Sequence, residues 1–433
     1  MLIYTSQITS RVQYTLHLIF KDVLQIEYQI TDNKQEFLDS DLPKLNYSMQ
    51  QFNNELFVES HGLLNQTEII DQEINFSKWD ELPIFFLSTN KETIPFDLFS
   101  ASFFLVTRYE EYLPHFKDHY NRFKAKESLA YQNDFLQLPL VNLWIKKFKE
   151  SLILKYPEIN FPDKNFQYIS TIDIDNAYYF LEKGFSRNLA SFLKYFIQFD
   201  KQMIKKRIDV LLGNQKDPYD TYNYQLNIIK KYKLDCFYFI LLGNYGLNDK
   251  NVLVTSRKFK LLIKHLADYA KIGLHPSFNS NSNYNLLKTE QERLLEITKT
   301  AVNHSRQHFL QLSFPSTYRN LIDLDIFNDY TMGYAELPGF RASICNPYYF
   351  YDLELEKQTP LRIHPFAIMD ATYRYYLKVS PEESLKSMKN IINQVKNVNG
   401  TLITVWHNET WSDYKEWKGW KLLFKNMVDY IYS

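Results

Sequence analysis

From Asn165 onward the chain alternates short apolar runs with longer segments whose apolar positions recur every three or four residues. The apolar runs at residues 168–174, 236–242, 272–275 and 401–407 have the length of strands, and helical patterns lie between them. Such an alternation is typical of parallel strands joined by crossover helices. Counting strand candidates gives roughly seven or eight, so we predict an α/β fold, a distorted (β/α) barrel of about seven strands.

The segment 380–398 is the clearest single helix. Ser380 and Glu383 have the spacing of a capping box, and Pro381 occupies the first helical position. An apolar stripe at helical spacing follows, and Gly400 lies beyond its end. We therefore predict an amphipathic helix here, with a buried strand after it.

A smaller α/β unit is expected before the barrel. Alternating β-prone stretches at residues 12–19 and 23–30 and the run PIFFLS at 83–88 predict strands. Asp97 is placed to cap a helix, and residues 141–154 form a second helical pattern. Two prolines and several turn formers near Phe161 mark the boundary, which divides the chain into units 1–160 and 161–433.

Composition and charge narrow the possible partners. The 433 residues contain 50 Lys plus Arg and 50 Asp plus Glu, so no overall field would attract nucleic acid. Cys236 and Cys345 are too few for a disulfide framework. No window of about 18 apolar residues and no signal-peptide pattern is visible, so we expect no membrane span and a cytoplasmic location. The oligomeric state stays open.

Candidate chemistry lies where strands end, because functional groups of α/β barrels collect at the C-terminal ends of the strands. Five segments place polar residues at such ends: 171–175, 273–276, 306–309, 368–370 and 405–408. Together they supply the Asp and His of a divalent metal site with an acid and a base. Asp173 and Asp175 share one strand face, and this pairing of like charges is costly unless a cation lies near.

In their order, these segments resemble the motifs of the polysaccharide deacetylase family, also known from the chitooligosaccharide deacetylase homology domain. The resemblance implies that Asp173 in TIDID is the catalytic base and that Asp175 is a metal ligand. It makes His275 in GLHPSFNS a second ligand, although Asn279 stands where the family has another His. His308 in RQHF could supply the missing imidazole and so complete a site of one carboxylate and two His.

The remaining family segments imply the rest of the catalytic set. Arg306 corresponds to an Arg that orients the base, and Asp370 with His407 corresponds to a pair that protonates the leaving amine. Arg341 is a further candidate for holding a carboxylate or binding substrate. The implied cofactor is a divalent ion, with zinc favoured and cobalt, nickel or manganese as alternatives.

The resemblance extends over nearly the full length of the chain. TMGY at 331–334, PGFR at 338–341 and TRYEEYL at 107–113 are similar to a divergent bacterial branch that carries an added N-terminal α/β domain. Within TRYEEYL, Arg108 and Glu111 have the i, i+3 spacing of a helical ion pair. Glu110 and Glu111 are adjacent and so point too far apart on a helix to flank one glycosidic bond.

The leading hypothesis is a metal-dependent hydrolase that removes an acyl group, expected to be N-acetyl, from a sugar or glycan precursor. A first rival is a catalytically degenerate barrel that binds a glycan or partner without turnover. Asn279 favours this rival and His308 opposes it. A second rival is an unrelated metal-dependent barrel hydrolase such as a phosphoesterase, which would need further His and Asp clusters for two metals.

Several residues also have structural explanations. His275 could pair with a backbone carbonyl, and His308 could be a satisfied core histidine. The basic run at 201–207 is most simply a solvated helix face. The histidines of the first unit lack an acid and a strand end nearby, so we expect no catalytic residue there; they are His17, His61, His115 and His119.

Overall fold

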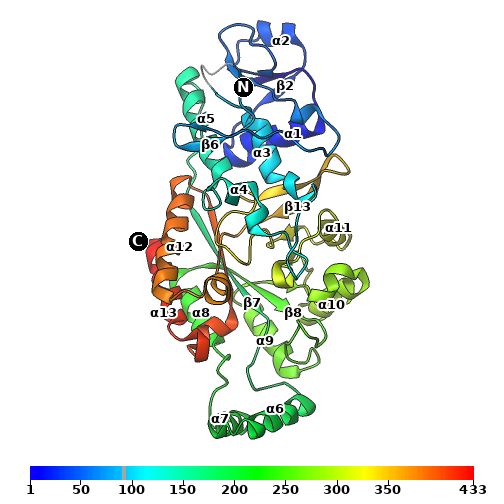
Figure 1. Ribbon diagram of the computed structural model, residues 1–433, viewed down its shortest axis with the longest axis vertical. Helices are drawn as coiled ribbons and strands as arrows, with labels where there is room; N and C mark the ends of the chain where they lie inside the picture. The colour runs from blue at the N-terminus through cyan, green and yellow to red at the C-terminus, as the bar shows by residue number, and fades with distance from the viewer. Residues whose placement is uncertain (90–93) are drawn as a thin grey trace.

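In the computed structural model, which describes residues 1–89 and 94–433, the first part of the chain forms a parallel sheet flanked by helices (Figure 1). The strand order is β2-β1-β3-β4, and a separate hairpin joins β5 to β6. The strands are β1 Leu2–Thr5, β2 Gln29–Thr31, β3 Lys44–Ser48, β4 Leu56–Glu59, β5 Ser77–Trp79 and β6 Leu82–Ile84. The helices are α1 Ser10–Leu16, η1 His17–Val23, α2 Lys34–Asp39, α3 Leu98–Val106, α4 Leu129–Gln132 and α5 Leu140–Lys155.

The predicted strand at 12–19 is wrong, because these residues lie in α1 and η1. Val12, Leu16 and Ile19 are all fully buried and have the i, i+4, i+7 spacing of one helix face. The predicted cap is confirmed: the Asp97 side chain accepts a hydrogen bond from the backbone of Ser100 at the start of α3. The first part is therefore a small α/β unit as predicted, although residues 12–19 are helical where a strand was predicted.

The second part of the chain contains a nine-stranded sheet whose strand order is β12-β13-β11-β10-β9-β8-β7-β15-β14. All neighbours pair in parallel except β12 and β13. The strands are β7 Gln167–Ile174, β8 Asp235–Leu241, β9 Lys271–His275, β10 His304–Ser305, β11 Asn328–Asp329, β12 Tyr348–Asp352, β13 Lys357–Ile363, β14 Ile368–Met369 and β15 Thr401–His407. The parallel β/α arrangement agrees with the sequence pattern.

No closed sheet is found among the described residues, so the mixed α/β character is confirmed and the barrel is not. The sheet ends at β14 on one side and at β12 on the other. Strands β10, β11 and β14 are two residues long, too short to supply the ladder that closure would need. The segments that follow β11 and precede β14 are joined by backbone bonds of 3.0 Å from Phe366 N to Met332 O and from Gly339 N to Ala367 O. An apolar cluster from β8, β14, β15 and the residues that follow β10 and β11 covers one face of the sheet, so this face is packed like a barrel interior.

Helices cover the outer face of this sheet (Figure 1). They are α8 Tyr222–Tyr232, α9 Arg257–Ala267, α10 Tyr284–Thr298, α11 Ser316–Asp323, α12 Pro381–Asn397 and α13 Trp420–Tyr432. The capping box of α12 is confirmed, because Ser380 and Glu383 each accept the hydrogen bond from the other's backbone N–H. None of the described helices is long and apolar enough to cross a membrane.

Two further helices, α6 Phe185–Ile197 and α7 Lys201–Leu211, form a hairpin at the end of the molecule opposite the first sheet (Figure 1). They are inserted between β7 and α8, immediately after the polar end of β7. The hairpin contacts itself along its length and is joined to the body by two extended connections.

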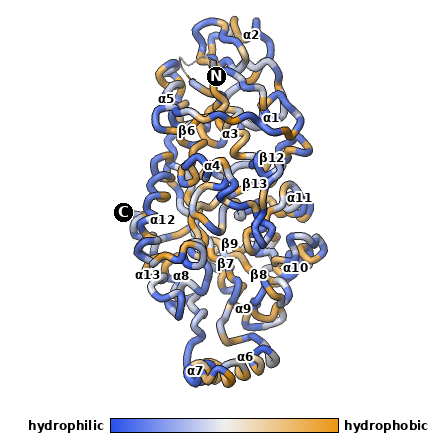
Figure 2. Tube along the Cα trace, in the orientation of Figure 1, coloured by the Kyte–Doolittle hydropathy of each residue, from blue (hydrophilic) through white to orange (hydrophobic). Residues whose placement is uncertain are grey.

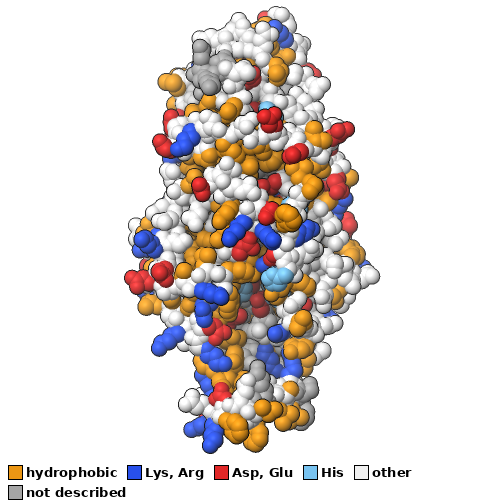
Figure 3. Space-filling view, in the orientation of Figure 1, with side chains coloured by type: hydrophobic (Ala, Val, Ile, Leu, Met, Phe, Trp, Pro, Cys, Tyr) orange, Lys and Arg blue, Asp and Glu red, His pale blue; other side chains and the backbone are white. Residues whose placement is uncertain are grey.

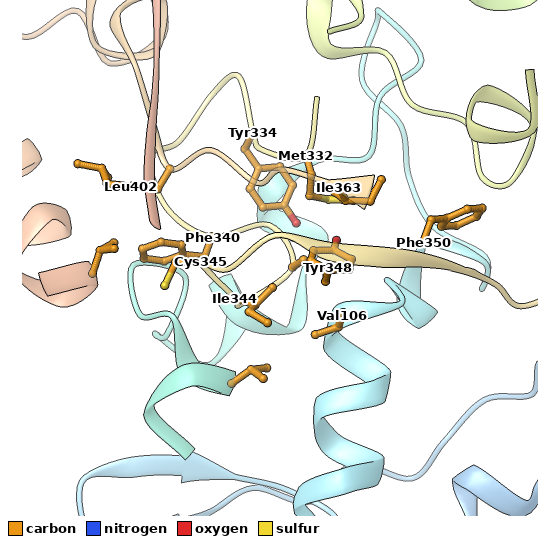
Figure 4. Close-up of a cluster of buried hydrophobic side chains, with 14 of the residues drawn as sticks. Val106, Met332, Tyr334, Phe340, Ile344, Cys345, Tyr348, Phe350, Ile363 and Leu402 are labelled. Carbon is orange, nitrogen blue, oxygen red and sulfur yellow. The ribbon is translucent and has the colours of Figure 1, made fainter. Parts of the chain in front are cut away.

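The two sheets are held together by a shared apolar core. Figure 4 shows Val106 of α3 facing Tyr348 and Phe350 of β12, with the segment 332–345 packed beside them. At the edge of this core Glu111 accepts hydrogen bonds from Arg341 at 2.6 and 2.9 Å and from Arg108 at 2.7 Å. The predicted pairing of Arg108 with Glu111 is confirmed, and the bonds from Arg341 to Glu111 join the two parts of the chain.

Candidate metal and catalytic site

The candidate site lies at the C-terminal ends of β7, β9 and β15, where the polar residues of the strand-end segments meet. Asp173 is the seventh residue of β7, and Asp175 directly follows this strand. Because the two residues are separated by one position, both carboxylates face the same side of the sheet. His275 ends β9 and His407 ends β15, on either side of them.

Asp175, His275 and His308 converge on one point. Their potential ligand atoms all lie within 4.8 Å of one another. Nε2 of His275 lies 3.2 Å from Oδ1 of Asp175, and Nε2 of His308 lies 3.5 Å from Oδ2. Both histidines are buried and Asp175 is partly exposed to the cavity. This is the set of one carboxylate and two imidazoles that the sequence suggested.

Hydrogen bonds from behind orient both rings. Nδ1 of His275 lies 2.5 Å from the backbone oxygen of Arg306, and Nδ1 of His308 lies 2.8 Å from Oδ1 of Asp249. Since a carbonyl oxygen can only accept, Nδ1 of His275 carries the proton and its Nε2 lone pair points at Asp175. A ring held in this way by an oxygen acceptor is the usual arrangement of a metal-binding histidine.

The arrangement fits a divalent cation. Oδ1 of Asp175 receives no hydrogen bond from the part of the chain that the structure describes, although it is buried. A lone pair of His275 faces it at 3.2 Å, and a cation would relieve this contact. Burial opposes ionisation of Asp175, but the neighbouring His308 holds its pKa well below the usual value. The same carboxylate, against the effect of burial, raises the pKa of His308 to about 9. The proton bound by His308 thus provides, next to Asp175, the positive charge that a metal ion would provide.

Arg306 holds Asp173 in place. Its Nη1 donates to Oδ1 of Asp173 at 2.8 Å and to Oγ1 of Thr171 at 2.6 Å, and its Nε donates to the Tyr330 carbonyl at 3.0 Å. The guanidinium is fully buried and lies 4.6 Å from the centre of the Phe239 ring. Asp173 is thus held in one orientation, with its other oxygen 4.0 Å from Nε2 of His275.

Asp370 orients His407 on the opposite side of Asp175. It accepts hydrogen bonds from the His407 backbone at 2.8 Å and from ring Nδ1 at 2.7 Å, and Thr410 Oγ1 also donates to it. Nε2 of His407 faces the cavity, 3.8 Å from Oδ2 of Asp175. Burial disfavours the charged ring, yet the carboxylate of Asp370 raises the pKa of His407 well above its ordinary value. The ring is therefore a proton donor at neutral pH.

Two acidic residues of the site were not predicted from the sequence. Asp249, which supports His308, lies in the loop between β8 and α9 and is not at a strand end. Glu409 lines the cavity two residues beyond His407, and burial raises its pKa to about 7 although His407 opposes the shift. The proximity of Glu409 to WHN was the only available signal, and nothing in the sequence distinguished Asp249.

The site opens into a cavity of about 400 Å³. In Figure 3 histidine and acidic side chains gather in a hollow on the visible face. Tyr375 and Tyr376 form part of the wall, and so do His119, Tyr120 and Arg122 of the first part of the chain. Arg122 is fixed there by the Phe309 carbonyl at 3.0 Å and by Tyr376 Oη at 3.2 Å. His119 therefore lines the cavity, and the expectation that the first part of the chain holds no catalytic residue stays a prediction.

Arg341 and Asn279 both lie outside the site. Arg341 is buried against Glu111 and Arg108, so it neither orients Asp173 nor lines the cavity, and its assignment to the catalytic set is corrected. The segment that follows β11 packs against the first part of the chain, where Phe340 N, next to Arg341, donates to the Leu136 carbonyl at 2.8 Å. Asn279 is exposed and outside the cluster, so His308 and not this position completes the trio.

Comparisons with known proteins give a partial picture. Residues 1–157 match the model of a family of unknown function, DUF7033. No curated protein matches the chain significantly. Among solved structures, a protein described as a polysaccharide deacetylase from Mycobacterium smegmatis is 13% identical, with a TM-score of 0.41 over 63% of this chain and 85% of that one.

Two other solved structures are similarly distant. An allantoinase is 10% identical, with a TM-score of 0.40 over 62% of this chain and 85% of its own. A pseudoenzyme of the carbohydrate esterase family CE4 from Bacillus anthracis is 8% identical, with a TM-score of 0.32 over 61% of each chain. These similarities are too weak to identify the activity or the family of this chain.

Proposed function

We propose that this chain is a metal-dependent hydrolase that removes an acyl group, N-acetyl by preference, from a sugar or glycan precursor. One observation supports the proposal: Asp173, held by Arg306, and His407, held by Asp370, both line the cavity that contains Asp175. In the proposal they are the base and the acid beside the candidate ligand trio. Amide hydrolysis needs both, one to activate water and one to protonate the leaving nitrogen.

A divalent ion held by Asp175, His275 and His308 would polarise the acyl carbonyl and lower the pKa of a neighbouring water molecule. We favour zinc, because nitrogen and carboxylate ligands in a set of three are common for this ion. The two His ligands need no reorientation, since their Nε2 atoms already face the Asp175 carboxylate. Cobalt, nickel and manganese are alternatives within the same donor set.

Asp173 takes the proton of the attacking water, and Arg306 keeps this carboxylate oriented until then. A carbon–oxygen bond forms at the acyl carbon while the carbon–nitrogen bond breaks. His407 donates its Nε2 proton to the nitrogen that leaves, so the products are a carboxylate and a free amine. Asp370 stabilises the charged imidazole before the transfer and fixes which nitrogen faces the substrate.

The test combines metal analysis with acetate release. Protein purified without chelator should contain about one transition-metal ion per chain, and it should release acetate from N-acetylated sugars. Asp173→Asn should lower turnover by about 10² to 10⁴ and retain the metal, because Asp173 is the base and not a ligand. Lys264→Gln, an exposed change on α9, is the control and should leave both readings unchanged. Metal binding without acetate release from any acylated sugar would contradict the hydrolase proposal.

The competing proposal is a barrel-like protein that binds a glycan without turnover. The observation that favours it is Asn279, which replaces a histidine of the motif that the sequence resembles. Calorimetry with N-acetylated oligosaccharides separates the two. Saturable binding by the metal-loaded protein, with no acetate released over hours, would favour the binding protein.

A further inference from the structure

A second cavity, of about 390 Å³, lies between the α6–α7 hairpin and the polar end of β7. Four basic side chains line it, and no carboxylate does so among the residues that the structure describes. The basic residues are Lys183, Arg187, Arg207 and Lys250, and tyrosine side chains fill much of the remaining wall. Such a wall is complementary to an anion, because it combines positive charge with hydroxyl donors.

The cations retain unused donors. Arg207 is 3% exposed, and its Nε has no hydrogen-bond partner among the described residues, while its Nη2 donates to Asn188. Nη2 of Arg187 is likewise buried and unpartnered within the described part of the chain. Burial, together with the Arg187 cation, lowers the pKa of Lys183 to about 8. A bound anion would supply the acceptor that these two guanidinium groups lack within the described part of the chain.

Asp217, a carboxylate near the cavity, forms hydrogen bonds with the backbone. It accepts four such bonds, from Tyr179 at 2.8 Å, Phe180 at 2.8 Å, Leu181 at 3.0 Å and Tyr219 at 2.9 Å. These bonds fix the turn after β7 and use both carboxylate oxygens. Asp217 therefore stabilises the backbone of the cavity and leaves the guanidinium donors free.

The cavity adjoins the candidate active site. Asn176 lines it and directly follows Asp175 in the chain, and Lys183 Nζ donates to Asn176 Oδ1 at 2.7 Å. The Asn176 carbonyl accepts a hydrogen bond of 2.8 Å from Asn408, the residue after His407. The walls of the two cavities therefore meet at the neighbouring residues Asp175 and Asn176.

We infer that this cavity binds the phosphate or diphosphate group of the acylated sugar, so that the substrate is a sugar phosphate rather than a neutral glycan. The inference rests on the proposed deacylase function for the position of the sugar. Arginine matches phosphate oxygens through paired N–H donors, and lysine adds a point charge. Arg207 contributes from inside the basic run 201–207, so this run is not simply a solvated helix face.

The outer face of the hairpin suggests how the phosphate is presented. Phe196, Ile197 and Phe199 are exposed by 71, 73 and 84%, and the exposed Lys201 and Lys205 lie beside them on α7. Figure 2 shows hydrophobic and hydrophilic positions intermixed along both helices of this tip. Amphipathic helices that combine exposed aromatic and aliphatic residues with lysine favour the surface of an anionic bilayer. We therefore expect the sugar phosphate to be carried by a lipid.

Binding to the cavity is tested with glucose 1-phosphate, which lacks an acyl group, titrated into metal-loaded protein by calorimetry. The double change Arg187→Gln with Arg207→Gln should weaken binding at least tenfold, whereas Lys264→Gln should not. Because Arg207 is buried, Lys183→Gln serves as a milder second variant and should weaken binding severalfold. Equal binding by folded wild-type protein and both variants would overturn the inference, since any phosphate would then lie elsewhere, for example on the metal.

Turnover distinguishes this inference from the proposed function. The wild type should deacetylate N-acetylglucosamine 1-phosphate with a kcat/KM at least ten times that for N-acetylglucosamine, and the arginine variants should lose this preference. If neither sugar is turned over, the deacylase proposal fails, while the calorimetric result still decides the phosphate cavity. Equal kcat/KM for both sugars would overturn the phosphate site of an active enzyme.

A third comparison identifies the carrier. The same N-acetyl sugar is supplied as a polyprenyl diphosphate in anionic vesicles and as a soluble nucleoside diphosphate. We expect faster turnover of the vesicle form, and Phe196→Ser with Ile197→Ser should lower the ratio of vesicle to soluble turnover at least tenfold. A higher rate on the nucleoside diphosphate, unaffected by vesicles, would overturn the lipid carrier and support the phosphate site with a soluble substrate.

Discussion

Asp249 supports the proposed metal ligand His308 through one hydrogen bond, so its replacement is a direct test of the site. Its Oδ1 accepts from His308 Nδ1 at 2.8 Å and from the Phe278 backbone at 3.0 Å. Asp249→Asn can retain an oxygen acceptor at this position but loses the negative charge, whereas Asp249→Ala loses both. Removal of such a supporting acceptor typically lowers metal affinity by about 10 to 100-fold. We expect about tenfold for Asn and about 100-fold for Ala, or roughly 1.4 and 2.7 kcal/mol.

The assay is competition for zinc between the protein and a chromophoric chelator. Asp235→Asn is the matched control, because Asp235 begins β8 at the other end of the sheet and pairs with Lys271 at the surface at 3.0 Å. The control should bind zinc as the wild type does. Unchanged affinity in both Asp249 variants, together with loss of zinc in His308→Ala, would refute the idea that Asp249 tunes this ligand. Unchanged affinity in all three would show that His308 does not hold the ion.

Three further predictions concern the proposed acid His407, Asn279 at the position where the family motif has His, and Glu111 at the contact between the two parts of the chain. His407→Ala should lower turnover of an N-acetylated sugar by about 10² to 10⁴ and lower turnover of an activated ester much less, since a good leaving group needs little protonation. Equal losses of turnover on both substrates would assign His407 another role. Asn279→Ala should change neither zinc affinity nor turnover, because Asn279 is exposed and outside the ligand cluster; a loss of either in a metal assay would place it in the site. Glu111→Gln should cost about 3 to 5 kcal/mol in urea unfolding at neutral pH, because it leaves two buried arginines short of a counter-charge. Burial opposes ionisation of Glu111, yet Arg341 and Arg108 lower its pKa to about 2. The stability that Glu111 contributes is therefore lost as pH falls from about 4.5 towards 2, and the free energies of unfolding of the wild type and the variant should then converge. A difference between the two that stays constant with pH would refute the ion pair as its cause.

Much of the local structure followed from the sequence. The capping box of α12 and the Asp97 cap of α3 depend on residues within one helical turn, so the pattern was sufficient to place both. The strand prediction at 12–19 failed because β-prone residues were weighed above a spacing that fits one helix face. The barrel was predicted to close, but three of its strands are two residues long, and strand length in a sheet depends on neighbours that the sequence does not reveal.

The groups at the strand ends could be predicted from the residue pattern alone. Asp173, Asp175, His275 and His407 lie at the ends of β7, β9 and β15, and parallel connection brings such ends to one edge of the sheet. The loop side chains that join them depend on the folded arrangement of the chain. Asp249 supports His308 from the loop after β8, and the first part of the chain contributes to the cavity wall.

The clearest contrast is Arg341, which looked equivalent to Arg306 as a partner for a catalytic carboxylate. Arg306 follows a strand of the sheet, so its position is tied to the register of the neighbouring strands and it reaches Asp173. Arg341 belongs to a long connection, whose path depends on apolar packing against the first part of the chain, and it pairs with Glu111 instead. Strand ends inherit their location from hydrogen-bonded pairing, whereas the location of a loop is set by the surfaces that it covers.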